Sequence, residues 1–99
     1  MKAKICNSWD ELVESGPGAV MFNEAESRLL FVCPNAGAPD ACSGVCNIPV
    51  NKTDCEGKPA WQMTGWPDAV TLSPSVYNCA HSQKCQWHGW LRNGEWVSV

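Results

Sequence analysis

The sequence lacks long hydrophobic runs. It contains no stretch of about eighteen consecutive apolar residues, which is the length that a transmembrane helix requires. The first six residues lead directly into polar Asn7, Ser8 and Asp10, so the apolar core of a secretory signal is missing as well. These two absences argue against a membrane partner, and they favour a cytoplasmic location.

Basic residues are few and scattered. The chain has seven Lys and Arg against ten Asp and Glu, which gives a net charge of −3. Binding to nucleic acid normally needs a basic stripe that neutralises phosphates, and no segment of the sequence supplies one. We therefore expect no nucleic-acid partner, and we interpret the charged side chains as a solvated surface.

Cysteine, by contrast, is abundant, with seven in 99 residues. Thiols stay reduced in the cytoplasm, so clustered cysteines there favour a metal over disulfides. A domain of this size buries only about 60–68% of the surface that its unfolded chain exposes. A structural zinc ion would add about 10–16 kcal/mol of apparent binding energy to folding. We therefore predict one structural Zn²⁺ in a single domain spanning residues 1–99.

Turn residues divide the chain into one short helix and a series of short strands. Residues 8–11 (Ser-Trp-Asp-Glu) match a capping box, which predicts a helix over about residues 8–15 that ends before Gly16. Beyond it, β-rich segments alternate with turns, and we expect strands at 19–23, 28–33, 47–50, 60–64 and 70–72. The sequence thus predicts a mainly β fold. It is a small zinc-ribbon-like single domain of antiparallel strands and hairpins, with its β core and zinc site in residues 19–99.

The C-terminal segment is predicted to be a β-hairpin. Asn93-Gly94 is the preferred two-residue type I′ turn, and it joins residues 87–92 to residues 95–99. The resulting register pairs Arg92 with Glu95, Leu91 with Trp96, Trp90 with Val97, and His88 with Val99. Strand alternation places His88, Trp90 and Arg92 on one face of this hairpin.

Cys85 and His88 lie three residues apart at the start of this hairpin, as ligands of a zinc site do. Cys33 ends an earlier predicted strand and supplies a third ligand. Cys42 and Cys46 lie on either side of Gly44, and of these two we rank Cys42 first.

Cys79 and His81 form a competing pair that could replace Cys85 and His88. The predicted zinc ligands are therefore Cys33, Cys42, Cys85 and His88, with Cys46, Cys79 and His81 as alternates. Cys6 and Cys55 have no ligand partner nearby, and we expect them to be free thiols.

Three motifs, in their order along the chain, carry a resemblance to a known family. They are Cys33-Pro34, residues 72–76 (Leu-Ser-Pro-Ser-Val) and residues 87–94 (Trp-His-Gly-Trp-Leu-Arg-Asn-Gly). From about Ala19 to Val99 the chain resembles DUF6527, a family of small domains common in bacteriophage and mobile-element genomes. The resemblance implies a zinc-ribbon-type site and a phage-encoded protein, located in the host cytoplasm or associated with the virion.

These features predict a structural-zinc module that binds a host or virion protein, with homo-oligomerisation left open. Six tryptophans exceed what so small a core can hide, and aromatic residues are enriched where proteins bind one another. Trp66, between Gly65 and Pro67, is the predicted partner-binding residue.

The alternative function is a small zinc-dependent hydrolytic enzyme with an open coordination position. The sequence has no H-E-x-x-H motif, and both of its histidines are among the predicted ligands. A cysteine nucleophile would need a free histidine beside it. We therefore expect that the protein is not an enzyme.

Overall fold

The computed structural model describes residues 1–35, 45–52, 60–78 and 87–99. These residues form one short helix and three small sheets, so the predicted mainly β, single-domain fold is confirmed. The helix is α1 (Trp9–Ser15), and the strands are β1 (Lys4–Ile5), β2 (Ala19–Asn23), β3 (Arg28–Val32), β4 (Val45–Pro49), β5 (Gln62–Thr64), β6 (Thr71–Ser73), β7 (Val76–Asn78), β8 (Trp87–Arg92) and β9 (Glu95–Ser98). Zinc-ribbon character is not seen in the described part of the chain.

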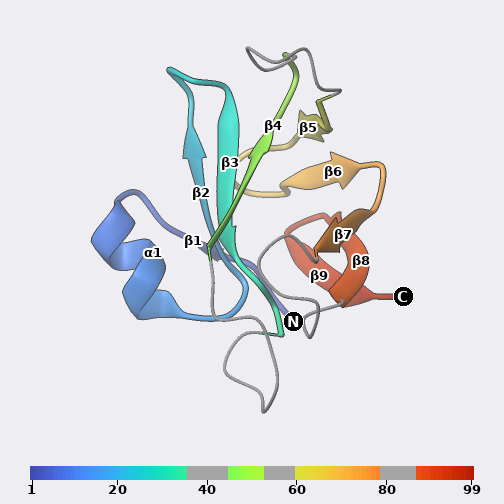
Figure 1. Ribbon diagram of the computed structural model, residues 1–99, viewed down its shortest axis with the longest axis horizontal. Helices are drawn as coiled ribbons and strands as arrows, with labels where there is room; N and C mark the ends of the chain where they lie inside the picture. Colours follow the sequence, from blue (N-terminus) through green and yellow to red (C-terminus); the bar gives the residue numbers. More distant parts are fainter. Residues whose placement is uncertain (36–44, 53–59, 79–86) are drawn as a thin grey trace.

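The four-stranded sheet has the order β1-β2-β3-β4, with β1 parallel to β2 and the other pairs antiparallel. The strands predicted at 19–23 and 28–33 form its β2–β3 hairpin, and the loop has four residues because Asn23 pairs with Arg28. Figure 1 shows α1 on one side of this sheet and the two smaller sheets on the other. Sequence reasoning missed β1, whose two residues are too few for a periodic pattern.

Helix α1 begins where the capping residue predicts. The Ser8 hydroxyl oxygen accepts a hydrogen bond from the Glu11 backbone N–H at 3.2 Å. The Glu11 carboxylate accepts from the N–H of Asn7, at 3.2 Å, and not from Ser8 as a capping box would have it. Leu12 is the buried residue of the helix and packs against Cys6, Ala19 and Val32.

The three-stranded sheet has the order β7-β8-β9. The β8–β9 register is the predicted one, from Arg92 opposite Glu95 to the 2.9 Å hydrogen bond that the Val99 N–H donates to the His88 carbonyl oxygen. Asn93 and Gly94 have the positive φ angles, 50° and 77°, that a type I′ turn requires. Strand β7 was not predicted. It pairs with the other edge of β8, so β8 is the central strand of this sheet.

Trp96 packs the three-stranded sheet against the rest of the molecule. Its side chain is 3% exposed, and its ring lies 5.1 Å from Phe31 and 5.4 Å from Trp87, centroid to centroid. The Trp96 indole N–H donates to the Gly18 carbonyl oxygen at 3.0 Å. The core around Trp96 draws on all three sheets, with Ala3, Val20, Leu29, Phe31, Cys46, Val50, Met63, Val70, Leu72, Val76 and Leu91.

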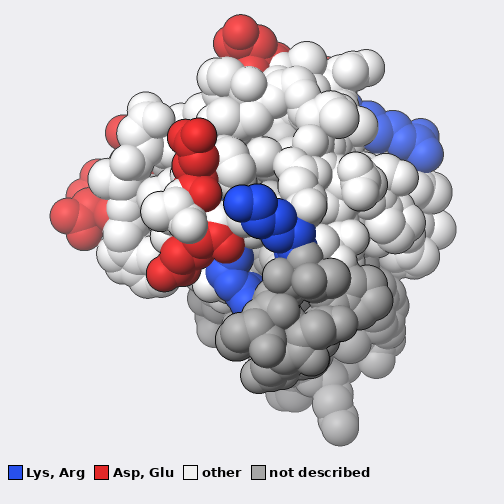
Figure 2. Space-filling view, turned by 90° about the horizontal axis from the view of Figure 1, so that it is seen from above, with Lys and Arg blue, Asp and Glu red and all other residues white. Residues whose placement is uncertain are grey.

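Acidic side chains gather on one side of the surface. Figure 2, which views the molecule from above, shows them on the side where α1 and the β2–β3 turn lie. The exposed acids of these two elements are Asp10, Glu11, Glu14, Glu24 and Glu26. Within the described residues, no helix has the length and apolar content needed to cross a membrane.

Candidate functional site

A serine hydroxyl and a histidine ring lie in contact where β7 pairs with β8. The Ser75 Oγ atom lies 2.9 Å from Nε2 of His88, and both side chains are half-buried. Ser75 occupies the two-residue connection between β6 and β7, and His88 is the second residue of β8. The antiparallel register pairs Val76 with Gly89, so strand pairing itself brings Ser75 to His88 across 13 residues of sequence.

Both residues are held by rigid neighbours. The Trp61 indole N–H donates to the carbonyl oxygen of Ser75 at 3.2 Å. Trp61 is itself fixed, because its backbone N–H donates to the Pro49 carbonyl oxygen at 3.0 Å and its carbonyl oxygen accepts from Asn51 at 2.7 Å. His88 lies on the central strand of its sheet, paired on both edges. Reactive groups on such elements keep the narrow geometry that catalysis needs.

The separation of 2.9 Å lies within the range of about 2.6–3.2 Å expected between a nucleophile and its general base. A serine hydroxyl is a weak nucleophile until a neighbouring base takes its proton. When Nε2 of His88 carries no proton, it accepts the Ser75 hydroxyl proton, as in Ser-His-Asp enzymes. The arrangement is therefore chemically competent for acyl transfer.

An aromatic ring and a guanidinium group continue from His88 along the same face of β8. The Trp90 ring lies 6.3 Å from the His88 ring, and the two planes are inclined by 32°. The guanidinium carbon of Arg92 lies 4.5 Å from the centroid of the Trp90 ring, at cation–π distance. The predicted alternation of β8 is thus confirmed.

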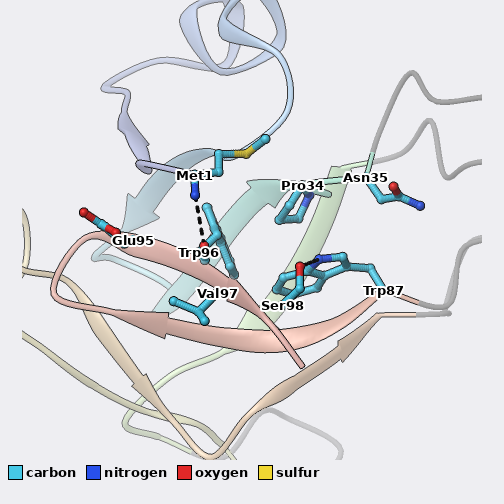
Figure 3. A pocket seen from close by; sticks show the side chains of 8 residues that line it. All are labelled: Met1, Pro34, Asn35, Trp87, Glu95, Trp96, Val97 and Ser98. Atoms are coloured by element: carbon cyan, nitrogen blue, oxygen red, sulfur yellow. Dashed lines mark hydrogen bonds between the residues drawn. The ribbon is translucent and has the colours of Figure 1, made fainter.

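A cavity of about 450 Å³ opens on the other face of this sheet. Figure 3 shows that Trp87 and Trp96 both line it, and the N–H of Trp87 donates to the Ser98 hydroxyl at 3.1 Å. Trp87 and His88 are consecutive in a strand, so their side chains point to opposite faces. The cavity is therefore not the cleft of the serine–histidine pair.

The structure describes only some of the predicted zinc ligands. Cys33 is fully buried just after β3, and Cys46 in β4 is 4% exposed. Cys46 pairs with Phe31, two residues before Cys33, so both thiols are on one face of the β3–β4 pair. Cys42, Cys79, His81 and Cys85 lie outside the described residues, as does Cys55. Within the described ranges, no three potential ligands cluster, and the zinc ion stays a prediction.

Trp66, the predicted partner-binding residue, is half-buried. Its ring packs edge-on against Phe22, with centroids 5.8 Å apart. Much of its surface therefore serves to cover the core, and a role in partner binding stays a prediction. Cys6 is free and buried as expected, at 1% exposure.

Sequence reasoning did not identify Ser75. The chain has eight serines, and a serine carries no local pattern that marks it as a nucleophile. The usable signal was the scarcity of histidine, since two histidines leave few possible Ser–His pairs. The prediction that both histidines are zinc ligands removes them as candidate bases, so no Ser–His pair is considered.

Comparison with protein-family models matches residues 5–99 to a family described as bacterial ubiquitination-like system serine protease (BubE). The match covers almost the whole chain. No curated protein and no solved structure matches it.

This match corrects the functional expectations drawn from the sequence. The matching family is not DUF6527, and it is described as part of a bacterial system, so the phage-encoded zinc module is wrong. The zinc-dependent hydrolase, offered as the alternative, is wrong because the family is named for serine chemistry. The expectation that the protein is not an enzyme is contradicted for the same reason. A place in a ubiquitination-like system is consistent with the expected protein partner.

Proposed function

Because the chain belongs to the bacterial ubiquitination-like system serine protease family, we propose that Ser75 is its nucleophile and His88 its general base. The observation that carries this assignment is the 2.9 Å contact between Ser75 Oγ and His88 Nε2. The family name supplies serine chemistry, and among the described residues this contact places a histidine base beside Ser75.

The proposed reaction runs through an acyl-enzyme. Ser75 Oγ attacks the carbonyl carbon of the scissile amide while His88 Nε2 takes the hydroxyl proton. His88 then gives that proton to the leaving nitrogen, and the C–N bond breaks. A water molecule, deprotonated by His88, attacks the resulting ester, and the proton returns to Ser75 as the acid product leaves.

The backbone N–H of Ser75 is placed to assist the first step. Within the described part of the chain, no backbone carbonyl accepts a hydrogen bond from it. The N–H of the nucleophile itself is one of the two oxyanion-hole donors in the chymotrypsin family. We assign it the same task here, which is to stabilise negative charge on the carbonyl oxygen under attack.

The proposed substrate is an amide bond in a protein of the ubiquitination-like system after which the family is named. The protein partner expected from the sequence is then the substrate. The cytoplasmic location expected from the sequence is part of this proposal.

A fluorophosphonate probe, which reacts with activated serine hydroxyls, tests the assignment. We expect one adduct per chain on the native protein, mapped to Ser75 by mass spectrometry, because only a hydroxyl beside a base attacks phosphorus rapidly. Ser75→Ala should abolish the adduct. Ser73→Ala, two residues away on β6, should retain it as the matched control. A folded native protein that gains no adduct, or gains it on another serine, contradicts the proposal.

We also propose that one structural zinc ion binds cysteine thiolates, apart from the catalytic pair. The supporting observation is the burial of Cys33 and Cys46 on one face of the β3–β4 pair, where an ion could reach both sulfur atoms. The proposed catalytic role of His88 leaves the cysteines and His81 as the candidate ligands. Such a site would contribute to folding only.

Native mass spectrometry checks this proposal. We expect one zinc per chain in the native protein, and its loss in Cys33→Ser, because removing a thiolate opens the coordination shell. Cys6→Ser is the matched control, since Cys6 is also a buried cysteine but is not a predicted ligand, and it should keep the metal. A native protein that carries no metal, and whose melting temperature is unchanged by chelation, would count against zinc.

A further inference from the structure

The outer face of β8 and β9 carries side chains that the catalytic assignment does not use. On β8 these are Trp90, half-buried, and Arg92, exposed. Val97 on β9 is 41% exposed, and Val99, just after this strand, is 71% exposed. The inner face, by contrast, holds Leu91 at 0% and Trp96 at 3%. The outer face is thus a largely apolar surface open to solvent, and it ends where Arg92 lies opposite Glu95.

This surface begins at the nucleophile. The β7–β8 register pairs Val76 with Gly89, and extending it by one residue places Ser75 opposite Trp90. Trp90 in turn pairs with Val97 on β9. One row across the sheet therefore runs from Ser75 over the Trp90 indole to Val97, with adjacent strands about 4.8 Å apart. A polypeptide whose scissile bond lies on Ser75 contacts this row.

Arg92 is available to bind such a polypeptide. Its guanidinium group lies over the Trp90 ring and forms no ion pair with a carboxylate of the described residues, although Glu95 is its cross-strand neighbour. Stacking on an indole fixes the plane of a guanidinium and leaves its edge N–H groups free. Those groups match the two oxygens of a carboxylate.

We propose that this face is the substrate platform of the protease, and that Arg92 selects an acidic residue in the bound polypeptide. Arg92 is two residues beyond Trp90, about 7 Å along the strand, so an extended substrate presents that acidic residue about two positions from the scissile bond. Arg92 is a specificity-determining residue and takes no part in bond cleavage. The inference rests on the proposed function of Ser75 and His88.

Internally quenched peptide libraries test the platform. In each library, one position near the cleavage site is fixed as Asp, Asn or Lys, and positions on both sides of the scissile bond are examined one at a time. We expect kcat/KM of the native protein to be about tenfold higher for Asp than for Asn at one position, which is the discrimination that a charge-assisted hydrogen bond gives. Arg92→Gln should remove this preference, and Arg92→Glu should shift it to Lys. Arg28→Gln removes an arginine from the four-stranded sheet, and it should leave the preference for Asp intact.

Hydrolysis of p-nitrophenyl acetate separates the two proposals, because its acetyl group is too small to reach Arg92. We expect the Arg92 variants to hydrolyse this ester within about twofold of the native rate, and Ser75→Ala to lose the activity. A native protein without any preference for Asp, or Arg92→Gln with the preference unchanged, overturns the platform and leaves the nucleophile assigned. If the native protein neither hydrolyses the ester nor reacts with the fluorophosphonate probe, the proposed function itself is overturned.

Discussion

Ser75→Ala is expected to lower kcat for protein cleavage by about 10³–10⁶-fold, and His88→Ala by a similar factor. Either substitution breaks the 2.9 Å contact through which the hydroxyl proton is removed. The double variant should be no slower than the single ones, because a nucleophile and its base act as one unit. Cleavage of a conjugate from the ubiquitination-like system and of p-nitrophenyl acetate measures both effects.

The matched control for this loss is Ser73→Ala, on β6, which we expect to keep the native kcat. Ser75→Ala should also keep the native melting temperature, since Trp61 donates to the backbone carbonyl of Ser75 and not to the hydroxyl. Folded Ser75→Ala and His88→Ala proteins that each retain a tenth of the native rate would disprove the pair. Additive losses in the double variant would argue that the two residues act separately.

Gly89→Ala is expected to destabilise the fold by about 3 kcal/mol, at the upper end of overpacking substitutions. A Cβ at this position would lie 2.3 Å from the Val97 carbonyl oxygen and 2.6 Å from the Trp87 ring. Neither neighbour has room to retreat, because Val97 belongs to the paired strand β9 and Trp87 packs on Trp96. For a domain of this size the melting temperature should fall by on the order of 15 °C.

Thermal unfolding followed by circular dichroism measures this effect. Gly16→Ala is the matched control, because Gly16 has a positive φ of 75° but no atom within 4 Å of an added Cβ. It should cost less than Gly89→Ala, because only the conformational penalty of the positive φ remains. If the two variants have the same melting temperature, an added Cβ at position 89 is accommodated without cost, and the tight packing of β8 is disproved. We expect Gly89→Ala to lower activity too, since His88 is the residue directly before it.

Much of the fold could be predicted where the chain uses local rules. The Ser8 cap and the Asn93-Gly94 turn act over two to four residues, and the structure places helix and hairpin where they predict. Strand β7 could not be predicted in this way. Its three residues follow Pro74 closely and obtain their partner from β8, through pairing that no local pattern encodes.

The candidate site shows the same limit more sharply. The alternation of His88, Trp90 and Arg92 follows from strand geometry and was predicted correctly. The partner of His88 was not, because Ser75 reaches it only through the unpredicted β7. The seven cysteines favour metal chemistry at the level of composition, where a serine hydroxyl carries no comparable signal. A serine becomes recognisable as a nucleophile only when its neighbours in space are known.

Hydrogen bonds of very long sequence separation join the segment around Met1 to strand β9. Met1 and Trp96 exchange backbone hydrogen bonds of 3.2 and 2.8 Å across 95 residues, and the Trp96 indole N–H donates to the Gly18 carbonyl oxygen across 78. Contacts between segments so far apart form slowly, because closing the loop between them costs conformational entropy. We therefore expect the three-stranded sheet, which carries His88, to dock late in the folding of the protein.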